Sequence, residues 1–269
     1  MSDELKTIKE GISLARELVQ AVKDNPDAKK AGGNLGKSAV VLSETINHAL
    51  LPLAALNYGI RKAKNYFAER FPNEMSEKAA AIPSEHLIEP KTSLAGPALQ
   101  GLAFTHEENE LREMFLNLLT TSMDDRIASN AHPAFVEIIK QLTTTEAQIL
   151  KIFIPREVSP IIAIRAKELN QSGSTQLATH ILNLYKKDEP AELDELSAMV
   201  DNWIRLGLLE VDYGSYLTAP EAYDWAEKRP EFIRIQSSID ESSKKIEIQR
   251  GLMRRTKFGE NFAAAVGLI

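Results

Sequence analysis

The sequence predicts a mainly α protein of the α+β class, in which an N-terminal helical domain precedes a winged-helix-like domain with a small β-hairpin. Apolar residues recur at helical spacing through much of the first 142 residues. An amphipathic stretch over residues 191–206 stops at Gly207, and a strand-like segment follows at once. Two β-rich segments, residues 244–249 and 252–256, flank Gly251 ahead of a closing helix from Phe258. Helix, strand and hairpin in this order are typical of a winged helix.

We expect the helical domain to span residues 1–142. An amphipathic helix over residues 3–24 places one apolar stripe on its surface: Leu5, Ile8, Ile12, Ala15, Val19 and Val22. This stripe either docks onto the same chain or forms a short intermolecular coiled coil. A longer helix over residues 38–71 is apolar on every side between residues 49 and 58. A helix of that kind belongs in the middle of a bundle.

Two capping-box patterns predict further helix starts. Thr105 and Glu108 precede a helix that carries Leu111, Phe115, Leu118 and Leu119. Residues 132–133, His-Pro, open another helix that runs to about residue 142. The second capping box, Thr143 and Glu146, begins the next helix. We place the domain boundary just before it.

The second domain is expected over residues 143–269. Residues 161–169 and 175–185 follow as helical patterns, and the helix of residues 191–206 turns Trp203 toward their core. An insertion of about residues 212–243 separates the strand after Gly207 from the hairpin, and its residues 219–228 are expected to be helical. The hairpin and closing helix complete the domain.

Composition places the chain among globular proteins. Of its 269 residues, 43% are hydrophobic and 26% are charged, with a formal net charge of −6 and no cysteine. The absence of cysteine excludes disulfides and thiolate sites. The acidic N-terminus lacks an apolar segment typical of a signal peptide, so a cytoplasmic location is expected. No apolar run approaches the roughly 20 residues of a stable membrane span.

No pattern predicts catalysis, a metal or a cofactor. Residues 31–38 fit a relaxed phosphate-loop pattern, but residues 24–30 before them cannot form the buried strand that such a loop requires. We interpret them as a linker between helices. The five histidines lack the spacing of a zinc-binding helix. The sequence therefore predicts a binding protein rather than an enzyme.

The distribution of charged residues indicates which segments could contact nucleic acid. Residues 191–206, which would form the reading helix of a winged helix, hold Glu192, Asp194, Glu195 and Asp201 against Arg205 alone. Such a helix repels phosphate. The expected hairpin is basic and is either a solvated surface or a contact for an acidic partner, which includes nucleic acid. Its candidate contact residues are Lys244, Lys245, Arg250, Arg254, Arg255 and Lys257.

Four places, taken in order, carry a family likeness. They are residues 89–90 (Glu-Pro) with 96–102 (which begin Gly-Pro), residues 110–119, residues 132–136 with 141–142, and residues 206–209 with 256–262. In these segments the chain resembles the Abi-alpha (abortive infection alpha) family of bacterial proteins. The resemblance implies a role in defence against phage, in which an infected cell stops growing or dies before phage matures. It implies no active-site residues.

The sequence and this resemblance together predict an abortive-infection component that acts by binding protein or nucleic acid. Self-association or a protein partner is expected, with nucleic acid limited to the basic hairpin. Two alternatives stay open. One is a winged-helix transcription regulator, which the predicted fold alone suggests. The other is an effector that perturbs membranes through the apolar helix of residues 39–60 once it is released.

Overall fold

The computed structural model describes residues 62–169, 173–240 and 242–269. These residues belong to two compact units: unit 1 contains residues 62–151 and 261–269, and unit 2 contains residues 152–260. The mixture of helices with an antiparallel sheet confirms the α+β class. The helix expected over residues 3–24, most of the one over residues 38–71, and the segment 31–38 lie outside the described residues. The domain limits of 1–142 and 143–269 remain a prediction.

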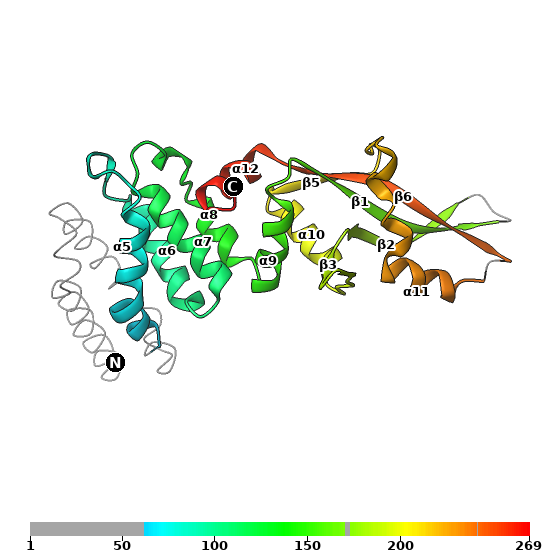
Figure 1. Ribbon diagram of the computed structural model, residues 1–269, viewed down its shortest axis with the longest axis horizontal. Coiled ribbons are helices and arrows are strands. Elements are labelled where there is room, and N and C mark those ends of the chain that lie inside the picture. The colour runs from blue at the N-terminus through cyan, green and yellow to red at the C-terminus, as the bar shows by residue number, and fades with distance from the viewer. Residues whose placement is uncertain (1–61, 170–172, 241) are drawn as a thin grey trace, which may run out of the picture. The chain divides into compact units, whose positions relative to one another are not determined.

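Unit 1 is built from helices (Figure 1). Residues 62–65 are helical and lead into a π-helical turn, η2 (Tyr66–Arg70), and then α5, in which Pro72 lies in the first turn, where a missing N–H is tolerated. The elements are α5 (Phe71–Ala79), η3 (Ser84–His86), α6 (Thr92–Thr105), α7 (Asn109–Ser122), η4 (Ala128–Asn130), α8 (Ala134–Lys140), most of α9 (Thr144–Phe153) and the later part of α12 (Lys257–Ala265).

The core of unit 1 forms around α7. The side chains expected to face inward, Leu111, Phe115, Leu118 and Leu119, are all buried. Gly101 lets α6 approach α7, because a Cβ built on it would lie 2.4 Å from Cζ of Phe115. The predicted apolar stripe of α7 is therefore confirmed as a core face.

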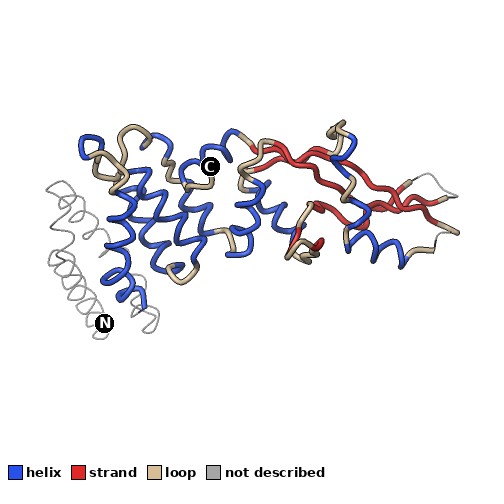
Figure 2. Tube along the Cα trace, viewed as in Figure 1, coloured by secondary structure: helices blue, strands red, loops and turns tan. Residues whose placement is uncertain are grey.

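Unit 2 contains a four-stranded antiparallel sheet of order β2-β1-β6-β5 (Figure 2). The strands are β1 (Val158–Glu168), β2 (Ser174–Leu182), β5 (Leu209–Asp212) and β6 (Lys244–Arg255), and a small separate hairpin joins β3 (Tyr185–Lys186) to β4 (Glu189–Pro190). Four consecutive residues of the inner strand β1, residues 161–164, are fully buried. β5 pairs only with the far end of β6, at residues 252–255, so the rest of β6 has β1 as its ladder partner.

Helical segments cover the sheet of unit 2. The helix α10 (Leu196–Arg205) packs Trp203, which is fully buried, and ends at Gly207 with a positive φ, as expected for a glycine C-cap. The insertion forms η5 (Pro220–Tyr223), η6 (Ala226–Lys228) and α11 (Pro230–Ser238). Tyr223, Trp225 and Phe232 of the insertion pack on Ile162 and Ile164 of β1. The insertion is thus part of the core of unit 2.

A buried ion pair fixes the insertion. Arg229 is fully buried and donates to the Glu231 carboxylate from Nε at 3.0 Å and Nη2 at 2.7 Å. Its other donors reach the carbonyl oxygens of Leu184 and Ala191 at 2.7 and 2.6 Å. The charge of this guanidinium is therefore paired, and each of its three nitrogens donates at least one hydrogen bond, as a buried Arg requires.

The two capping boxes have different outcomes. At the second, the Thr143 N–H donates to Glu146 Oε2 at 2.8 Å, and the Glu146 N–H donates to Thr143 Oγ1 at 3.1 Å, which confirms it. The first is wrong, because α7 begins at Asn109 with Glu108 at its N-cap position. Thr105 instead ends α6, and its hydroxyl donates to the Gly101 carbonyl at 3.1 Å.

Three secondary-structure predictions for unit 2 are wrong. Residues 161–169 and 175–185 form most of β1 and β2 rather than helices, and residues 244–255 form one continuous strand rather than a hairpin that turns at Gly251. A Cβ at Gly251 would lie 2.6 Å from Cδ1 of Tyr213, so this glycine marks a close approach within a strand. The order of helix, strand and hairpin expected for a winged helix is therefore not found among residues 152–169, 173–240 and 242–260.

Candidate functional site

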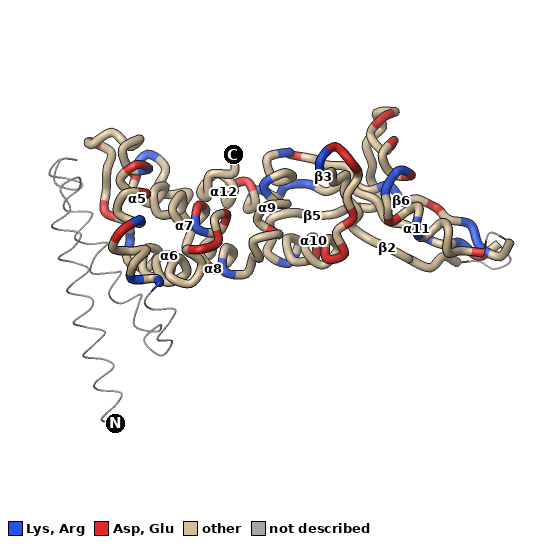
Figure 3. Tube along the Cα trace, turned by 60° about the horizontal axis from the view of Figure 1, so that its bottom comes forward, with Lys and Arg blue, Asp and Glu red and all other residues tan. Residues whose placement is uncertain are grey.

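The basic residues predicted on a hairpin lie along one strand and the start of the next helix. Lys244, Lys245, Arg250, Arg254 and Arg255 belong to β6, and Lys257 begins α12. Figure 3 shows Lys and Arg positions spread along β6, with acidic positions on neighbouring segments. The structure therefore distributes the predicted cluster along a strand and does not gather it on a tip.

Most of these six cations have partners within unit 2. Lys244 pairs with Glu168 at 3.0 Å, and Arg254 lies 4.0 Å from Glu210 and 3.8 Å from Asp212. Arg255 donates to the carbonyls of Ile154 and Pro155, and Arg250 lies over the Tyr223 ring. Lys257 pairs with Glu260 at 3.0 Å, which lowers the pKa of that carboxyl. Five of the six cations therefore have a contact within unit 2, although Lys257 stays exposed and Lys244 partly exposed beside their partners.

Lys245 differs from the other five, because it is exposed and its side chain forms no ion pair, hydrogen bond or ring contact within the described residues. Its direct neighbour across the β1–β6 ladder is Lys167, which is also exposed and also lacks such a pair within the described part of the chain. Two like charges thus stand opposite each other on paired strands, an arrangement that destabilises a sheet. Sequence analysis missed Lys167 because it assigned that segment to a helix.

A groove opens at the same end of the sheet. It has a volume of about 560 Å³ and is lined by Leu169, Glu227, Phe232, Gln236, Lys244, Lys245 and Ile246. Leu169 exposes 53% of its surface there, and its N–H donates to the Ser243 carbonyl at 3.0 Å, which joins the ends of β1 and β6. We call these residues together with Lys167 the basic groove. It combines Lys245 and Lys167, which form no ion pair within the described residues, with the paired Lys244, with Glu227 and with the exposed side chain of Leu169.

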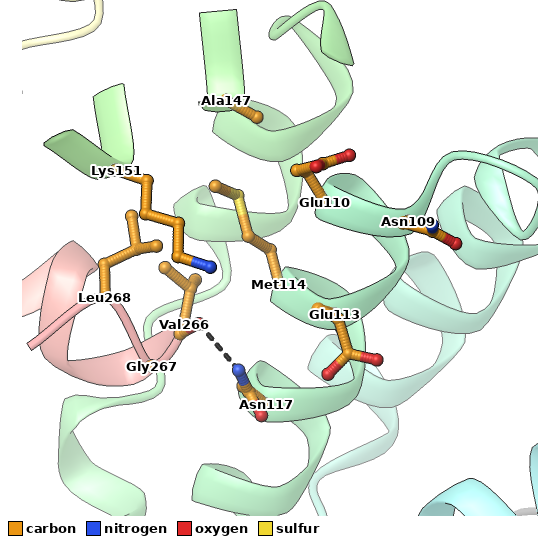
Figure 4. Close-up of a pocket in the computed structure, with 10 residues that line it drawn as sticks. All are labelled: Asn109, Glu110, Glu113, Met114, Asn117, Ala147, Lys151, Val266, Gly267 and Leu268. Atoms are coloured by element: carbon orange, nitrogen blue, oxygen red, sulfur yellow. Dashed lines mark hydrogen bonds between the residues drawn. The ribbon is translucent and has the colours of Figure 1, made fainter. Parts of the chain in front are cut away.

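A second pocket lies within unit 1, between α7, α9 and residues 266–268 (Figure 4). Its volume is about 360 Å³. Met114, Ala147 and Val266 give it an apolar floor, and Lys151 extends its side chain across the opening in the close-up view. The remaining lining residues are Asn109, Glu110, Glu113, Asn117, Gly267 and Leu268.

Charges in this pocket are partly compensated. Lys78 donates to Glu113 at 2.9 Å and to the Asn117 side-chain oxygen at 2.8 Å, and Asn117 in turn donates to the Val266 carbonyl at 2.9 Å. Glu110 accepts a hydrogen bond from Gln148 at 3.1 Å, which is neutral. Lys151 has no ion pair with any carboxylate in the described ranges. Within the described part of the chain, the pocket thus retains one positive side chain, Lys151, and one negative side chain, Glu110, that form no ion pair.

A Tyr–His–Asp network lies inside unit 2. The Tyr213 hydroxyl is 3.2 Å from His180 Nδ1 and accepts the His180 backbone N–H at 3.0 Å, while His180 Nε2 lies 3.2 Å from the Asp201 carboxylate. His180 has a φ of 55° at an irregularity of the β1–β2 ladder. Burial lowers the pKa of His180, against the attraction of Asp201, and raises the pKa of Tyr213.

This network is suited to structure rather than to nucleophilic chemistry. A nucleophile requires a lowered pKa or free access to substrate, whereas the Tyr213 hydroxyl has a raised pKa and is shared between His180 and the Ile162 carbonyl at 3.4 Å. A neutral His180 donates from Nε2 to Asp201 and accepts from Tyr213 at Nδ1. The network therefore holds the bulged part of β2 against β1 and α10.

The described residues contain no group of three or more His, Asp or Glu side chains placed to bind a metal ion. None of the helices within those ranges is both long enough and apolar enough to span a bilayer. Both candidate sites are concave surfaces lined by lysines, carboxylates and apolar side chains.

Comparison with known proteins identifies the family. The family model for abortive infection alpha matches residues 63–266, and the chain belongs to this family. This match confirms the membership predicted from the four sequence segments that occur in order along the chain. The family points to abortive infection, a form of defence against phage. No curated protein and no solved structure matches the chain.

Proposed function

We propose that the chain is a binding component of an abortive-infection response, and that the basic groove of unit 2 contacts a protein partner. The expected partner presents acidic side chains beside apolar ones. Family membership supports the role in phage defence, and the groove supports binding as the way in which the role is performed.

The observation that carries this proposal is the Lys167–Lys245 pair. Cross-strand like charges cost stability in the free protein. An acidic partner would relieve that repulsion. The free energy that the repulsion costs in the free protein would then favour formation of the complex. Two rungs further along the same ladder, Arg165 stands opposite Glu247, so these strands also place opposite charges across from each other.

Apolar surface beside the lysines favours a protein over nucleic acid. Leu169 is half exposed, and Phe232 and Ile246 line the same groove. Apolar anchors that become buried supply much of the affinity at protein interfaces, whereas nucleic-acid affinity depends on many phosphate contacts. Of the six predicted cations, four are engaged by carboxylates or carbonyls of unit 2. A duplex would find few free cations along β6.

The transcription-regulator alternative gains no support from unit 2. Its proposed reading helix is acidic, with Asp201 paired to His180, and the preceding Glu192 pairs with Arg234. The membrane alternative depends on residues 39–60, which lie outside the described residues. Protein binding through the basic groove therefore stays the leading proposal.

Phage plating on matched variants tests the proposal. One variant combines Leu169→Asp with Lys245→Glu in the groove. The control combines Tyr185→Asp with Lys186→Glu on the separate hairpin, where Tyr185 has the same 53% exposure as Leu169. We expect the groove variant to plate phage at least tenfold more efficiently than wild type, because defence is lost, while the control retains protection.

Two results would count against this proposal. If deletion of the whole gene leaves plating unchanged across a broad phage panel, the role in defence fails. If deletion abolishes protection but the groove variant still protects fully, the role stands and the groove assignment fails. Thermal unfolding of each purified variant, with a midpoint near that of wild type, is the control for folding.

A further inference from the structure

We propose that the pocket of unit 1 binds a small zwitterionic ligand with an apolar side chain, of the free α-amino acid class. Nothing in the proposed contact with a protein partner requires this site, which belongs to the other unit. It is defined by Glu110, Met114, Lys151 and Val266.

The volume of the pocket and its apolar lining residues favour a small molecule with an apolar part. A volume of about 360 Å³ lies at the lower end of the range of small-molecule sites. Met114, Ala147 and Val266 line the cavity but are almost completely buried, whereas the lining residue Leu268 is partly exposed. An aliphatic side chain would displace water from Leu268.

The charges of the pocket call for both signs on one ligand. Glu113 is already neutralised by Lys78, which leaves Glu110 and Lys151 as the lining charges without an opposite charge in the described residues. Glu110 and Lys151 lie on different helices and form no ion pair with each other. A carboxylate placed at Lys151 and an ammonium placed at Glu110 would satisfy both.

Ligands of a single charge fit less well. An anion would gain Lys151 but meet the Glu110 carboxylate in the same small cavity, and a cation would gain Glu110 but meet Lys151. A divalent metal would have Lys151 beside it and would compete with Lys78 for Glu113. A zwitterion avoids each of these repulsions.

Isothermal titration of the full-length protein tests the proposal. The probes are the twenty common amino acids, L-leucine first. For the tightest binder, titrations follow with the amine that lacks its carboxylate and the acid that lacks its ammonium, which for leucine are 3-methylbutylamine and 4-methylpentanoate. We expect the amino acid to bind at least tenfold more tightly than either analogue.

Variants locate the binding. Lys151→Met and Glu110→Gln should each weaken binding at least tenfold, because each removes one charge while retaining side-chain length. Lys91→Met, a change of the same type at an exposed lysine on the N-terminal side of α6, should leave binding unchanged. Equal thermal midpoints for the variants and wild type control for folding.

The proposal is overturned if none of the twenty amino acids gives measurable heat at millimolar concentration. It is also overturned if either single-charge analogue binds as tightly as the amino acid, since both charges would then not be required. Binding that survives both Lys151→Met and Glu110→Gln would place the ligand elsewhere.

Discussion

Strand β6 and the pocket of unit 1 both carry several charged side chains, but they differ in how those charges are matched. On β6, Lys244, Arg254 and Arg255 meet carboxylates or carbonyls of adjacent segments. In the pocket, Lys151 and Glu110 face the same cavity without pairing. A count of basic residues in the sequence selects β6 as the candidate binding site. The pairing of charges in space selects different candidates: Lys151, and Lys245 with Lys167.

The comparison teaches that a compensated charge and an uncompensated charge have different roles. Removing one partner of a buried charge pair destabilises the fold strongly, whereas removing one partner of an exposed pair has little effect. A charge that stays unmatched beside a concave apolar surface contributes little to folding and is available to a ligand. Changing one charge at a time separates a contribution to folding from availability to a ligand.

The largest effect is expected at Arg229, the most completely matched charge. Replacing it with Met leaves the Glu231 carboxylate and the Leu184 and Ala191 carbonyls without their donor. Breaking a buried pair from one side costs about 3–5 kcal/mol, so urea unfolding should show a loss of this size. Arg234→Met, at an exposed pair with Glu192, is the matched control and should lose far less. Equal losses would contradict the burial argument.

A smaller effect is expected at His180, whose charge is disfavoured by burial. Its pKa in the folded state is lowered, so the unfolded state binds more protons as the pH falls below the ordinary pKa of about 6.5. The contribution of His180 is therefore present above pH 6.5 and is lost on acidification. Urea unfolding at pH 7.5 and pH 5.5 should show a smaller pH dependence in His180→Asn than in wild type. Asn retains a side chain that tolerates the positive φ.

The groups that face His180 determine how strongly it contributes to the pH dependence of stability. Asp201 of α10 favours the charged imidazole, and Tyr213 meets the ring from the segment after β5. Asp201→Asn should therefore increase the pH dependence, because it removes the attraction that opposes burial. An unchanged pH dependence in both variants would show that His180 does not titrate in this range.

The smallest effect on folding is expected at the exposed lysines. Lys257→Met removes a surface pair with Glu260, and Lys151→Met removes a charge with no such pair among the described residues. Exposed pairs contribute little, so thermal unfolding should place both midpoints close to that of wild type. A marked loss in Lys151→Met would mean that this lysine is a structural element, and it would remove the basis for treating it as a ligand contact.

Among the described residues, the sequence predicted the helices α7 and α9 of unit 1 better than the strands of unit 2, and the reason is physical. Helices with one buried stripe, such as α7, show the period of 3.6 directly, and the Thr143–Glu146 box marks a helix start through two specific hydrogen bonds. β1 is an inner strand whose residues 161–164 are buried on both faces, so it shows no alternation of apolar and polar residues. β2 has register shifts that disturb its period as well.

The candidate sites show the same limit. Lys245 was found from the sequence because it belongs to a run of basic residues, but its contrast with Lys244 depends on Glu168, which is distant in the chain. Lys167 becomes a candidate only once β1 is known to pair with β6. Lys151 is a single lysine on a helix, and no local signal distinguishes it from a solvated one. Three-dimensional pairing of charges is not encoded in composition.

The central claim is that uncompensated lysines, and not the basic strand as a whole, carry the function. Efficiency of plating with Lys245→Met and Lys257→Met tests it most directly, since both changes remove one positive charge near the ends of β6, and only Lys257 has a carboxylate partner among the described residues. The account predicts that Lys245→Met weakens phage protection and Lys257→Met leaves it intact. Equal loss of protection in both variants, or a loss in Lys257→Met alone, would contradict it.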